Sequence, residues 1–334
     1  MSETTDITTA DVCAAAIADA FKDDGEIFAS PMGMLPMLGV RLAKLTSNPD
    51  LVISDGEALF LAGVPPLFAK ADKVEGWIPF RKVFDVVAYG KRHVMMGATQ
   101  IDRHGNQNIS AIGDFAQPKR QLLGSRGAPG NTVNNRTSYW VPRHSPRVFV
   151  EAVDIVSGVG PSRAAAAGAA RFNDIHRVVS NLGVLDVNGP ERTLRLLSVH
   201  PGVTVAQVRE ASGCAIHVDG ADSDVPETRL PTTEELLVIR EVLDPKGLRF
   251  KEVPRPEVAQ LSSRGSVRRS PTSSGSGTRS CRPAWAGSPA PVWSPAPLTP
   301  AGWASWPAPR CPTRSSRRRS SRSRAAPTPP SAST

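Results

Sequence analysis

Apolar positions recur along the first part of the chain with helical and strand periods in turn. Helical spacing over Thr8–Phe21 predicts a first helix, a short apolar run at Glu26–Ser30 predicts a strand, and helical spacing returns over Pro31–Thr46. A second short apolar run, Leu51–Ser54, is closed by a polar turn and predicts another strand. Strands that alternate with helices in this order are typical of a parallel sheet.

The alternation continues towards residue 250. Helical spacing predicts three more helices, at Phe80–Ala88, Thr204–Ala211 and Thr233–Leu243. Further strands or apolar segments are predicted at His93–Gln100, Gln121–Gly124, Arg147–Val156, Arg177–Asp186 and Thr193–Ser198, the last two as a pair. At Pro161–Ala170 a surface loop is favoured over a short helix, because Gly168 interrupts it and large apolar anchors are missing. The pattern as a whole predicts an α/β fold.

The C-terminal part differs from the rest in composition. Residues 261–334 contain 18 Ser, 13 Pro and 12 Arg, and none of the 31 acidic residues of the chain. Such a segment buries too little apolar surface to offset its chain entropy. We therefore expect residues 1–254 to form the folded domain and residues 255–334 to be a disordered tail or a frame-shifted extension. The alternative is that the basic run Arg314–Arg324 binds RNA or DNA, since clusters of arginine are favourable on phosphates.

The distribution of charge and cysteine narrows the class of protein. The net charge of +9 resides in the tail, since the first 260 residues hold 28 basic and 31 acidic side chains. The basic balance is thus no argument for a specific nucleic-acid partner. There is no run of 18 apolar residues, which argues against a membrane span. Only Cys13 and Cys214 lie in the body, without metal spacing or a disulfide framework, so a cytoplasmic protein is expected.

Two loops that follow apolar segments are the candidate site, because open α/β sheets bind ligands at strand ends. Ser54-Asp55-Gly56-Glu57 supplies a hydroxyl and two carboxylates, although an acidic turn is also a common structural element. In Gly124–Asn131, three glycines let backbone N–H groups approach an oxyanion, and Arg126 suits a carboxylate. The sequence has no phosphate-binding P-loop, HExxH, CxxC or GxSxG motif, and its six histidines are scattered, so no metal site is predicted.

Four segments resemble, in order, successive blocks of the β subunit of class I CoA-transferases. They are Val94–Ser110, Gly124–Asn131, Arg147–Gly160 and Leu196–Gly213. Within that family the chain is most similar to the β subunits of CoA-thioester hydrolases that open the last steroid rings in cholesterol-degrading bacteria. The resemblance covers residues 8–254. It implies a three-layer α/β/α CoA-transferase-like fold with a mainly parallel sheet, an α subunit as partner in an α2β2 heterotetramer, and an active site between the two subunits.

The chain departs from the transferase pattern at two positions. The transferases carry their nucleophilic glutamate in an S-E-N-G-like turn, and aligning that turn with I-S-D-G places Ser54 at the glutamate and Asp55 at the asparagine. A neutral hydroxyl cannot form the carboxylic anhydride of the transfer reaction. The G-x-G-G-A pattern of the oxyanion loop falls on Gly124–Ala128, so Arg126 stands where a glycine is usual. Both departures favour hydrolysis over transfer.

Three hypotheses follow from the resemblance. The first is a hydrolase that cleaves a C–C bond of a cyclic diketone carried as a CoA thioester in steroid degradation, with the enolate stabilised by Arg126 and the amides of Gly127 and Ala128. Its substrate-binding candidates are Ser54, Asp55, Glu57, Gly130, Asn131 and Asn134. The second is a true CoA-transferase, with Glu57 as nucleophile, that exchanges CoA between an acyl-CoA and a carboxylic acid. The third is a silent scaffold for the α subunit. None requires a cofactor beyond the coenzyme A of the substrate.

Overall fold

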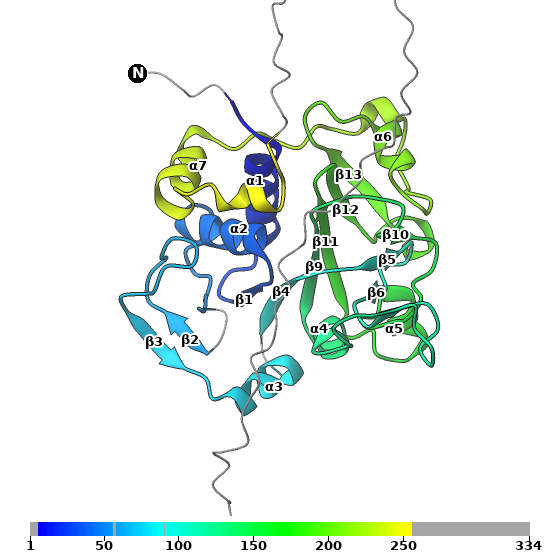
Figure 1. Ribbon diagram of the computed structural model, residues 1–334, viewed down its shortest axis with the longest axis horizontal. Coiled ribbons are helices and arrows are strands. Elements are labelled where there is room, and N and C mark those ends of the chain that lie inside the picture. Colours follow the sequence, from blue (N-terminus) through cyan, green and yellow to red (C-terminus); the bar gives the residue numbers. More distant parts are fainter. Residues whose placement is uncertain (1–5, 56–57, 90, 256–334) are drawn as a thin grey trace, which may run out of the picture. The chain divides into compact units, whose positions relative to one another are not determined.

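A six-stranded mixed sheet forms the centre of the computed structural model (Figure 1), which describes residues 6–55, 58–89 and 91–255. Four neighbouring strands are parallel: β1 (Phe28–Pro31), β4 (Arg92–Gly97), β9 (Arg136–Val141) and β11 (Asp174–Ser180). At one edge, β12 (Gly183–Asp186) and β13 (Arg195–Val199) continue the sheet in antiparallel pairing. The expected pairing with Thr193–Ser198 is confirmed for β12. The prediction of a single strand over Arg177–Asp186 is wrong, because the chain turns back between β11 and β12 within this segment.

The other elements lie around this sheet. The helices are α1 (Thr9–Phe21), α2 (Met34–Leu45), α3 (Phe80–Tyr89), α4 (Ala128–Asn134), α5 (Pro161–Ala166), α6 (Val205–Glu210) and α7 (Thr233–Leu237), the last continued by a π-helical turn at Val238–Leu243, with 3-10 turns at Pro190–Arg192, Asp222–Asp224 and Leu248–Lys251. Three small sheets are formed by β10 (Phe149–Val150), β5 (Gln100–Asp102) and β6 (Gln107–Asn108), by β2 (Leu59–Leu61) and β3 (Val74–Trp77), and by β7 (Ala111–Ile112) and β8 (Arg120–Gln121).

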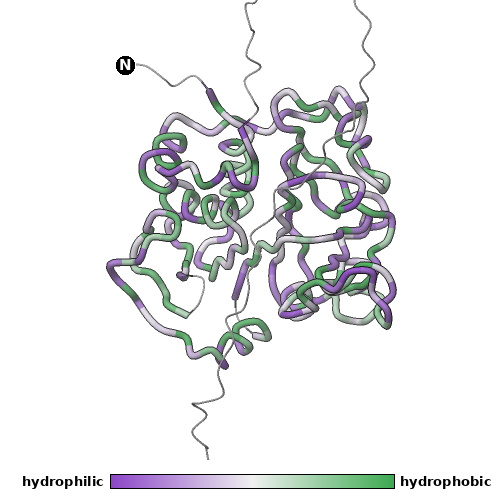
Figure 2. Tube along the Cα trace, in the orientation of Figure 1, coloured by the Kyte–Doolittle hydropathy of each residue, from purple (hydrophilic) through white to green (hydrophobic). Residues whose placement is uncertain are grey.

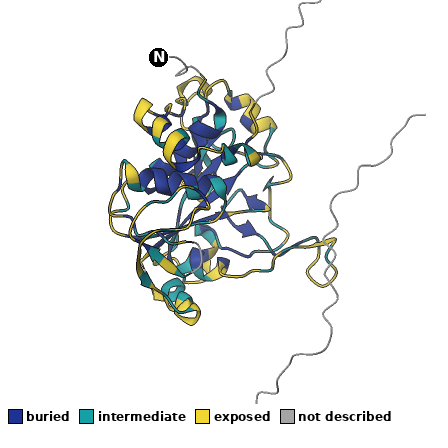
Figure 3. Cartoon of the chain, turned by 60° about the vertical axis from the view of Figure 1, so that its left-hand side comes forward, coloured by how far each residue is buried: buried dark blue, intermediate teal, exposed yellow. Residues whose placement is uncertain are grey.

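Side chains of the central strands alternate between two hydrophobic cores, as the two-residue period of a strand requires. In β4, Met95 joins the core that α1 and α2 close, while Val94 and Met96 join the core on the other face, with α6. β9 repeats the alternation with Trp140 and Tyr139. Hydrophobic and buried residues accordingly gather in the sheet and in the helices packed on it (Figures 2 and 3). The predicted three-layer, mainly parallel fold is confirmed.

Polar side chains fix the ends of the two helices that cover β1 and β4. Thr8 and Asp11 form a reciprocal capping box at the start of α1, as the sequence indicates. The start of α2 has no such residue, and Glu252 supplies the missing acceptor: its carboxylate receives the N–H groups of Met34 and Leu35 at 2.9 and 3.1 Å. This long-range cap ties residue 252 to the N-terminal helices.

Three further local predictions differ from the structure, and one strand was not predicted. Leu51–Ser54 forms two isolated bridges instead of a regular strand. The predicted strand His93–Gln100 is divided into β4 and β5 by residues 98–99. Pro161–Ala166 is helix α5, because proline suits a first helical turn and alanine is the strongest helix former. β9 is not predicted at all, because both of its faces are buried and its apolar residues form a continuous run without alternation.

The predicted tail 255–334, with its basic run, lies outside the described residues apart from Arg255. Within the part of the chain that the structure describes, no helix is both long enough and apolar enough to cross a membrane.

Candidate functional site

The Ser54–Asp55 turn follows a segment that runs beside β1. Ala29 donates its N–H to the Val52 carbonyl at 2.9 Å, so the preceding segment extends the sheet by a single bridge. Ser54 is half-buried and forms a bridge with Phe60. Oδ1 of Asp55 accepts the N–H groups of Ala58 and Leu59, both at 3.0 Å, and thereby closes the turn. Asp55 thus has a structural role here, and Glu57 lies outside the described residues.

The second loop turns into a helix earlier than its glycines indicate. α4 begins at Ala128, with Pro129 in its first turn, so the expectation of a loop as far as Asn131 is wrong. Ahead of the helix, Arg126 adopts φ +46°, a conformation that favours glycine, and its side chain is exposed. Among the described residues, its guanidinium has no hydrogen-bond or ion-pair partner. Within the described residues, Arg126 is therefore an exposed, unpaired cation on a turn whose backbone is strained.

The backbone amides of this turn are not equivalent. Ala128 donates its N–H to the Ser125 carbonyl at 3.0 Å, so that donor is already used within the turn. For the N–H of Gly127 we find no acceptor in the described ranges. The Ser125 hydroxyl lies 3.1 Å from that of Ser110, which anchors the turn to the neighbouring loop. Of the two amides that the sequence suggests, Gly127 and Ala128, only that of Gly127 is available for a ligand in the described part of the chain.

The candidates on α4 take different positions. Asn131 is only 2% exposed, and its side chain bonds within the protein, as described below. Gly130 lies against α3, where a Cβ would come within 2.7 Å of Cγ1 of Val87, so glycine is needed for the packing of the two helices. Asn134 is half-buried. Asn131 and Gly130 therefore shape the site from behind, whereas Asn134 retains an accessible side chain.

A buried arginine that the sequence patterns do not single out connects the two loops. Arg92, the first residue of β4, donates from Nη1 to Oδ1 of Asn131 at 2.9 Å and from Nη2 to the Ser30 hydroxyl at 2.6 Å. Its guanidinium also lies 5.8 Å from the ring centre of Phe28, which packs edge-on against Phe60. Because Phe60 is the bridge partner of Ser54, these contacts place both loops on one side of β1 and β4.

A serine, a histidine and an aspartate also lie in a row beneath the sheet. Nδ1 of His93 lies 2.6 Å from Asp24, and Nε2 lies 2.8 Å from the Ser138 hydroxyl, which is the order of a hydrolytic triad. The side chains of Ser138 and His93 are 0% exposed. No acyl group can reach this hydroxyl, so the row is a structural hydrogen-bond network.

Helix α3 presents an apolar surface to solvent. None of its residues is buried. Phe80 and Phe84, whose rings pack edge-on with centres 5.6 Å apart, are 78% and 63% exposed. Trp77, next to it in β3, is 66% exposed and pairs with Leu59, close to the Ser54 turn. At its other end α3 packs on α4 through Val87. This apolar surface, Trp77 to Phe84, therefore runs between the two candidate loops.

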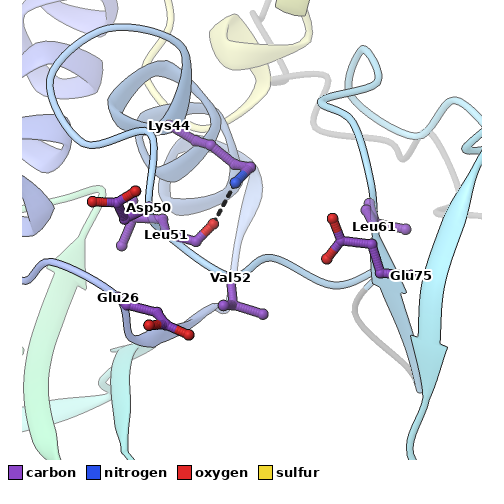
Figure 4. A pocket seen from close by; sticks show the side chains of 7 residues that line it. All are labelled: Glu26, Lys44, Asp50, Leu51, Val52, Leu61 and Glu75. Carbon is purple, nitrogen blue, oxygen red and sulfur yellow. Dashed lines mark hydrogen bonds between the residues drawn. The ribbon is translucent and has the colours of Figure 1, made fainter.

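A cavity of about 380 Å³ lies on the outer side of the segment that leads to Ser54 (Figure 4). Its lining includes three carboxylates, those of Glu26, Asp50 and Glu75. The ammonium group of Lys44 donates a hydrogen bond to the Leu51 carbonyl at 2.5 Å. None of the candidate loop residues lines this cavity. Because carboxylates repel phosphates, it is a poor site for the anionic coenzyme A moiety.

Comparisons with known proteins agree with this geometry. The fold is that of glutaconate coenzyme A-transferase from Acidaminococcus fermentans, with a TM-score of 0.62 at 24% identity, covering 73% of this chain and 97% of that one. The fold places the chain in the class of CoA-transferase-fold proteins, and the turn before α4 carries an arginine. No protein-family model matches the chain.

Two relatives place the chain within that class. It is 60% identical over 255 residues to the "Cholesterol ring-cleaving hydrolase IpdB subunit" of Rhodococcus jostii, covering 76% of this chain and 99% of the relative. It also matches the crystal structure of Rhodococcus jostii RHA1 IpdAB, with a TM-score of 0.71 and 58% identity, over 75% of this chain and 99% of that one. The chain belongs to the family of IpdB subunits of cholesterol ring-cleaving hydrolases, and the resemblance found in the sequence is confirmed.

Proposed function

We propose that this chain is the β subunit of a heteromeric hydrolase that cleaves a carbon–carbon bond of a cyclic diketone carried as a CoA thioester, in the degradation of steroid rings. The relative named for cholesterol ring cleavage matches it over 99% of its own length. Water adds to a ring carbonyl, the adjacent C–C bond breaks, a carboxylate forms, and the departing carbon takes a proton. Coenzyme A enters as part of the substrate, and the reaction consumes only water.

The observation that carries the proposal is the unpaired guanidinium of Arg126 on the turn before α4. Negative charge develops on the enolate that leaves, and a cation in a water-poor site stabilises it in the transition state. The N–H of Gly127 is the second donor, since it has no acceptor among the described residues. Ala128, whose N–H already bonds to Ser125, shapes the turn and does not contribute a second amide as the sequence suggests. Asn134 remains the candidate for orienting the substrate from α4.

The base that activates water lies, in this proposal, on the partner subunit. Ser54 replaces the glutamate of the transferases, and the carboxylate of Asp55 accepts two N–H groups of its own turn. His93 is enclosed beneath the sheet. A carboxylate of an α subunit that faces Arg126 across the interface supplies the missing function, because a carboxylate near neutral pH is a competent general base.

The hydrolase and the transferase differ in one covalent intermediate. We expect that the complex of this chain with its partner subunit, incubated with an acyl-CoA and then treated with hydroxylamine or borohydride, shows no modified glutamate by mass spectrometry. A true transferase accumulates a glutamyl-CoA thioester and follows ping-pong kinetics. Detection of such an adduct on Glu57 would contradict the hydrolase and show that the protein is a transferase.

We further propose that the partner subunit covers the apolar surface of Trp77 to Phe84, in an α2β2 assembly in the cytoplasm. This surface lies between the two loops of a site that requires groups from a second chain, so the covering chain also completes the site. Exposed apolar patches of this kind mark interfaces in soluble proteins. The free thiols of Cys13 and Cys214 suit a reducing compartment.

Phe84→Glu is expected to prevent co-purification of the partner subunit, because it places a charge within the apolar surface. Size-exclusion chromatography with light scattering measures the loss of the heteromeric peak. The matched control is Phe115→Glu, which changes a residue that is 75% exposed and lies outside α3. Retention of the complex by Phe84→Glu, or its loss in both variants, contradicts this placement of the interface.

A further inference from the structure

Arg92 is a buried cation with no carboxylate partner among the residues that the structure describes. It is 7% exposed, and its partners are the neutral side chains of Asn131, Ser30 and Phe28. Its Nε is buried and has no acceptor in the described part of the chain. Arg249, which is also enclosed, differs because it is paired with both Asp11 and Asp244. Taking a charge out of water without a counter-ion is unfavourable, so stability alone does not account for Arg92.

The contacts of Arg92 lead directly to the turn that carries Arg126. Asn131 accepts from Arg92 and donates its own N–H to the Gly127 carbonyl at 2.9 Å. The Asn131 side chain also lies behind Gly127, where a Cβ would come within 3.4 Å of Nδ2. A displacement of Asn131 therefore moves the start of α4, and with it the Gly127 N–H and the backbone of Arg126.

The other arm of Arg92 fixes the opposite loop. Its bond to Ser30 and its position against Phe28 hold two residues of β1. Phe28 packs on Phe60, the bridge partner of Ser54. One planar guanidinium thus sets the distance between the Ser54 turn and α4, and its fork geometry makes it stiffer than a lysine in that place.

We propose that Arg92 is a positioning residue of the hydrolase site, which aligns the Arg126 turn through Asn131 and sets its distance from the Ser54 turn through Ser30. Its positive charge is buried in a surrounding of low dielectric constant, and it therefore also favours the anionic enolate over the neutral ring ketone from which the enolate forms. Burial lowers the pKa of Arg92 to about 10, and the side chain stays charged at neutral pH. This inference rests on the proposed function, since it concerns the alignment of the same turn.

The test uses Arg92→Met and Arg92→Lys in the complex with the partner subunit. Arg92→Met removes the charge and leaves no orphaned carboxylate, so the thermal midpoint is expected to stay within about 5 °C of the wild type. Turnover is expected to fall about tenfold or more, with KM changed less than about threefold, because misplacement of a transition-state donor acts on kcat. Arg92→Lys keeps the charge but loses the two-armed contact, so it recovers only part of the turnover.

The matched control is Arg41→Met. Arg41 is also 7% exposed and has a buried Nε without a partner, but its Nη1 bonds to Met37 within its own helix α2. We expect this variant to keep the wild-type turnover. Equal losses of turnover in the Arg41 and Arg92 variants mean that a buried arginine is needed only for the fold, and the inference is then wrong.

Two further measurements separate a positioning role from a structural one. In a background that already carries Arg126→Ala, Arg92→Met is expected to lower turnover by a much smaller factor than it does in the wild type. The reason is that the turn that Arg92 aligns has already lost its cation. Amide hydrogen exchange is expected to become faster in α4 of Arg92→Met and to stay unchanged in Arg41→Met. Independent losses that multiply, together with unchanged exchange in α4, overturn the inference.

The outcome also distinguishes this inference from the proposed function. If the wild-type complex does not hydrolyse the thioester substrate, the proposed function fails, while hydrogen exchange still reports whether Arg92 holds α4. If Arg126→Ala abolishes turnover and Arg92→Met leaves it unchanged, the proposed function stands and only the role of Arg92 is refuted.

Discussion

Arg126→Ala is expected to lower kcat by about 10²-fold or more in the complex with the partner subunit, because the variant removes the charged donor that faces the enolate. The thermal midpoint should not fall, since the side chain is exposed and has no partner among the described residues. Steady-state hydrolysis of the CoA thioester measures the effect. Turnover within about threefold of the wild type would favour the silent scaffold over the enzyme.

A second variant separates the charge of Arg126 from the shape of its turn. Arg126→Gly restores the residue of the transferases, and at φ +46° it relieves strain of about 1 kcal/mol. We expect it to be at least as stable as the wild type and as inactive as Arg126→Ala. Arg163→Ala, a change at an exposed arginine of α5, serves as the control with normal turnover.

Asp24→Ala is expected to give the largest loss of stability among single changes outside the two cores. The Asp24 carboxylate is 1% exposed and accepts from Nδ1 of His93 at 2.6 Å and from Nη1 of Arg136 at 2.7 Å. Removal of one partner of a buried charged network costs about 3 kcal/mol, which lowers the thermal midpoint by on the order of 10 °C. Glu151→Ala, which breaks the exposed pair with Arg103, is the control and should shift it little.

The same network sets the direction of the pH dependence. Burial opposes the ionisation of Asp24, but hydrogen bonds from His93 and Arg136 outweigh it and lower the pKa of Asp24. Burial also lowers the pKa of His93 below its usual range, and those of His144 and His200 to about 4. Each group binds a proton more readily in the unfolded chain, so stability is lost as the pH falls.

The window follows from these shifts. The histidine contribution is lost from about pH 6.5 downward, and that of Asp24 below about pH 4. Thermal melts between pH 8 and pH 4 should therefore show a falling midpoint, with Asp24→Ala less stable than the wild type throughout the neutral range. A midpoint that stays constant down to pH 4.5 is incompatible with histidines that are buried in neutral form.

The helices α1 and α2 are parts of the fold that the sequence predicted well. Their apolar residues repeat at helical spacing, although most residues of α1 are buried, and Thr8 and Asp11 form the cap at the start of α1. β9 was not predicted, because residues 139–141 are buried on both faces of the sheet and apolar and polar residues do not alternate there. The glycines at positions 124–130 indicated a loop, whereas Pro129 and the packing of Gly130 on α3 make the second half helical.

For the candidate site, the sequence by itself determined which residues occupy the two loops: a serine stands at the position aligned with the transferase nucleophile, and an arginine lies in the glycine turn before α4. Residue identity at positions matched to a family is local information, and no coordinates are needed to read it. Only the tertiary structure showed that Ala128 has no free N–H, that Asn131 is buried, and that Arg92 links both loops. The bond of Ala128 is local, to Ser125, and depends on the conformation of the turn. The other two properties depend on contacts between residues about 40 to 60 positions apart in the chain, such as Arg92 with Asn131 and with Ser30. Such contacts arise from the packing of β1, β4 and α4, which no local pattern records.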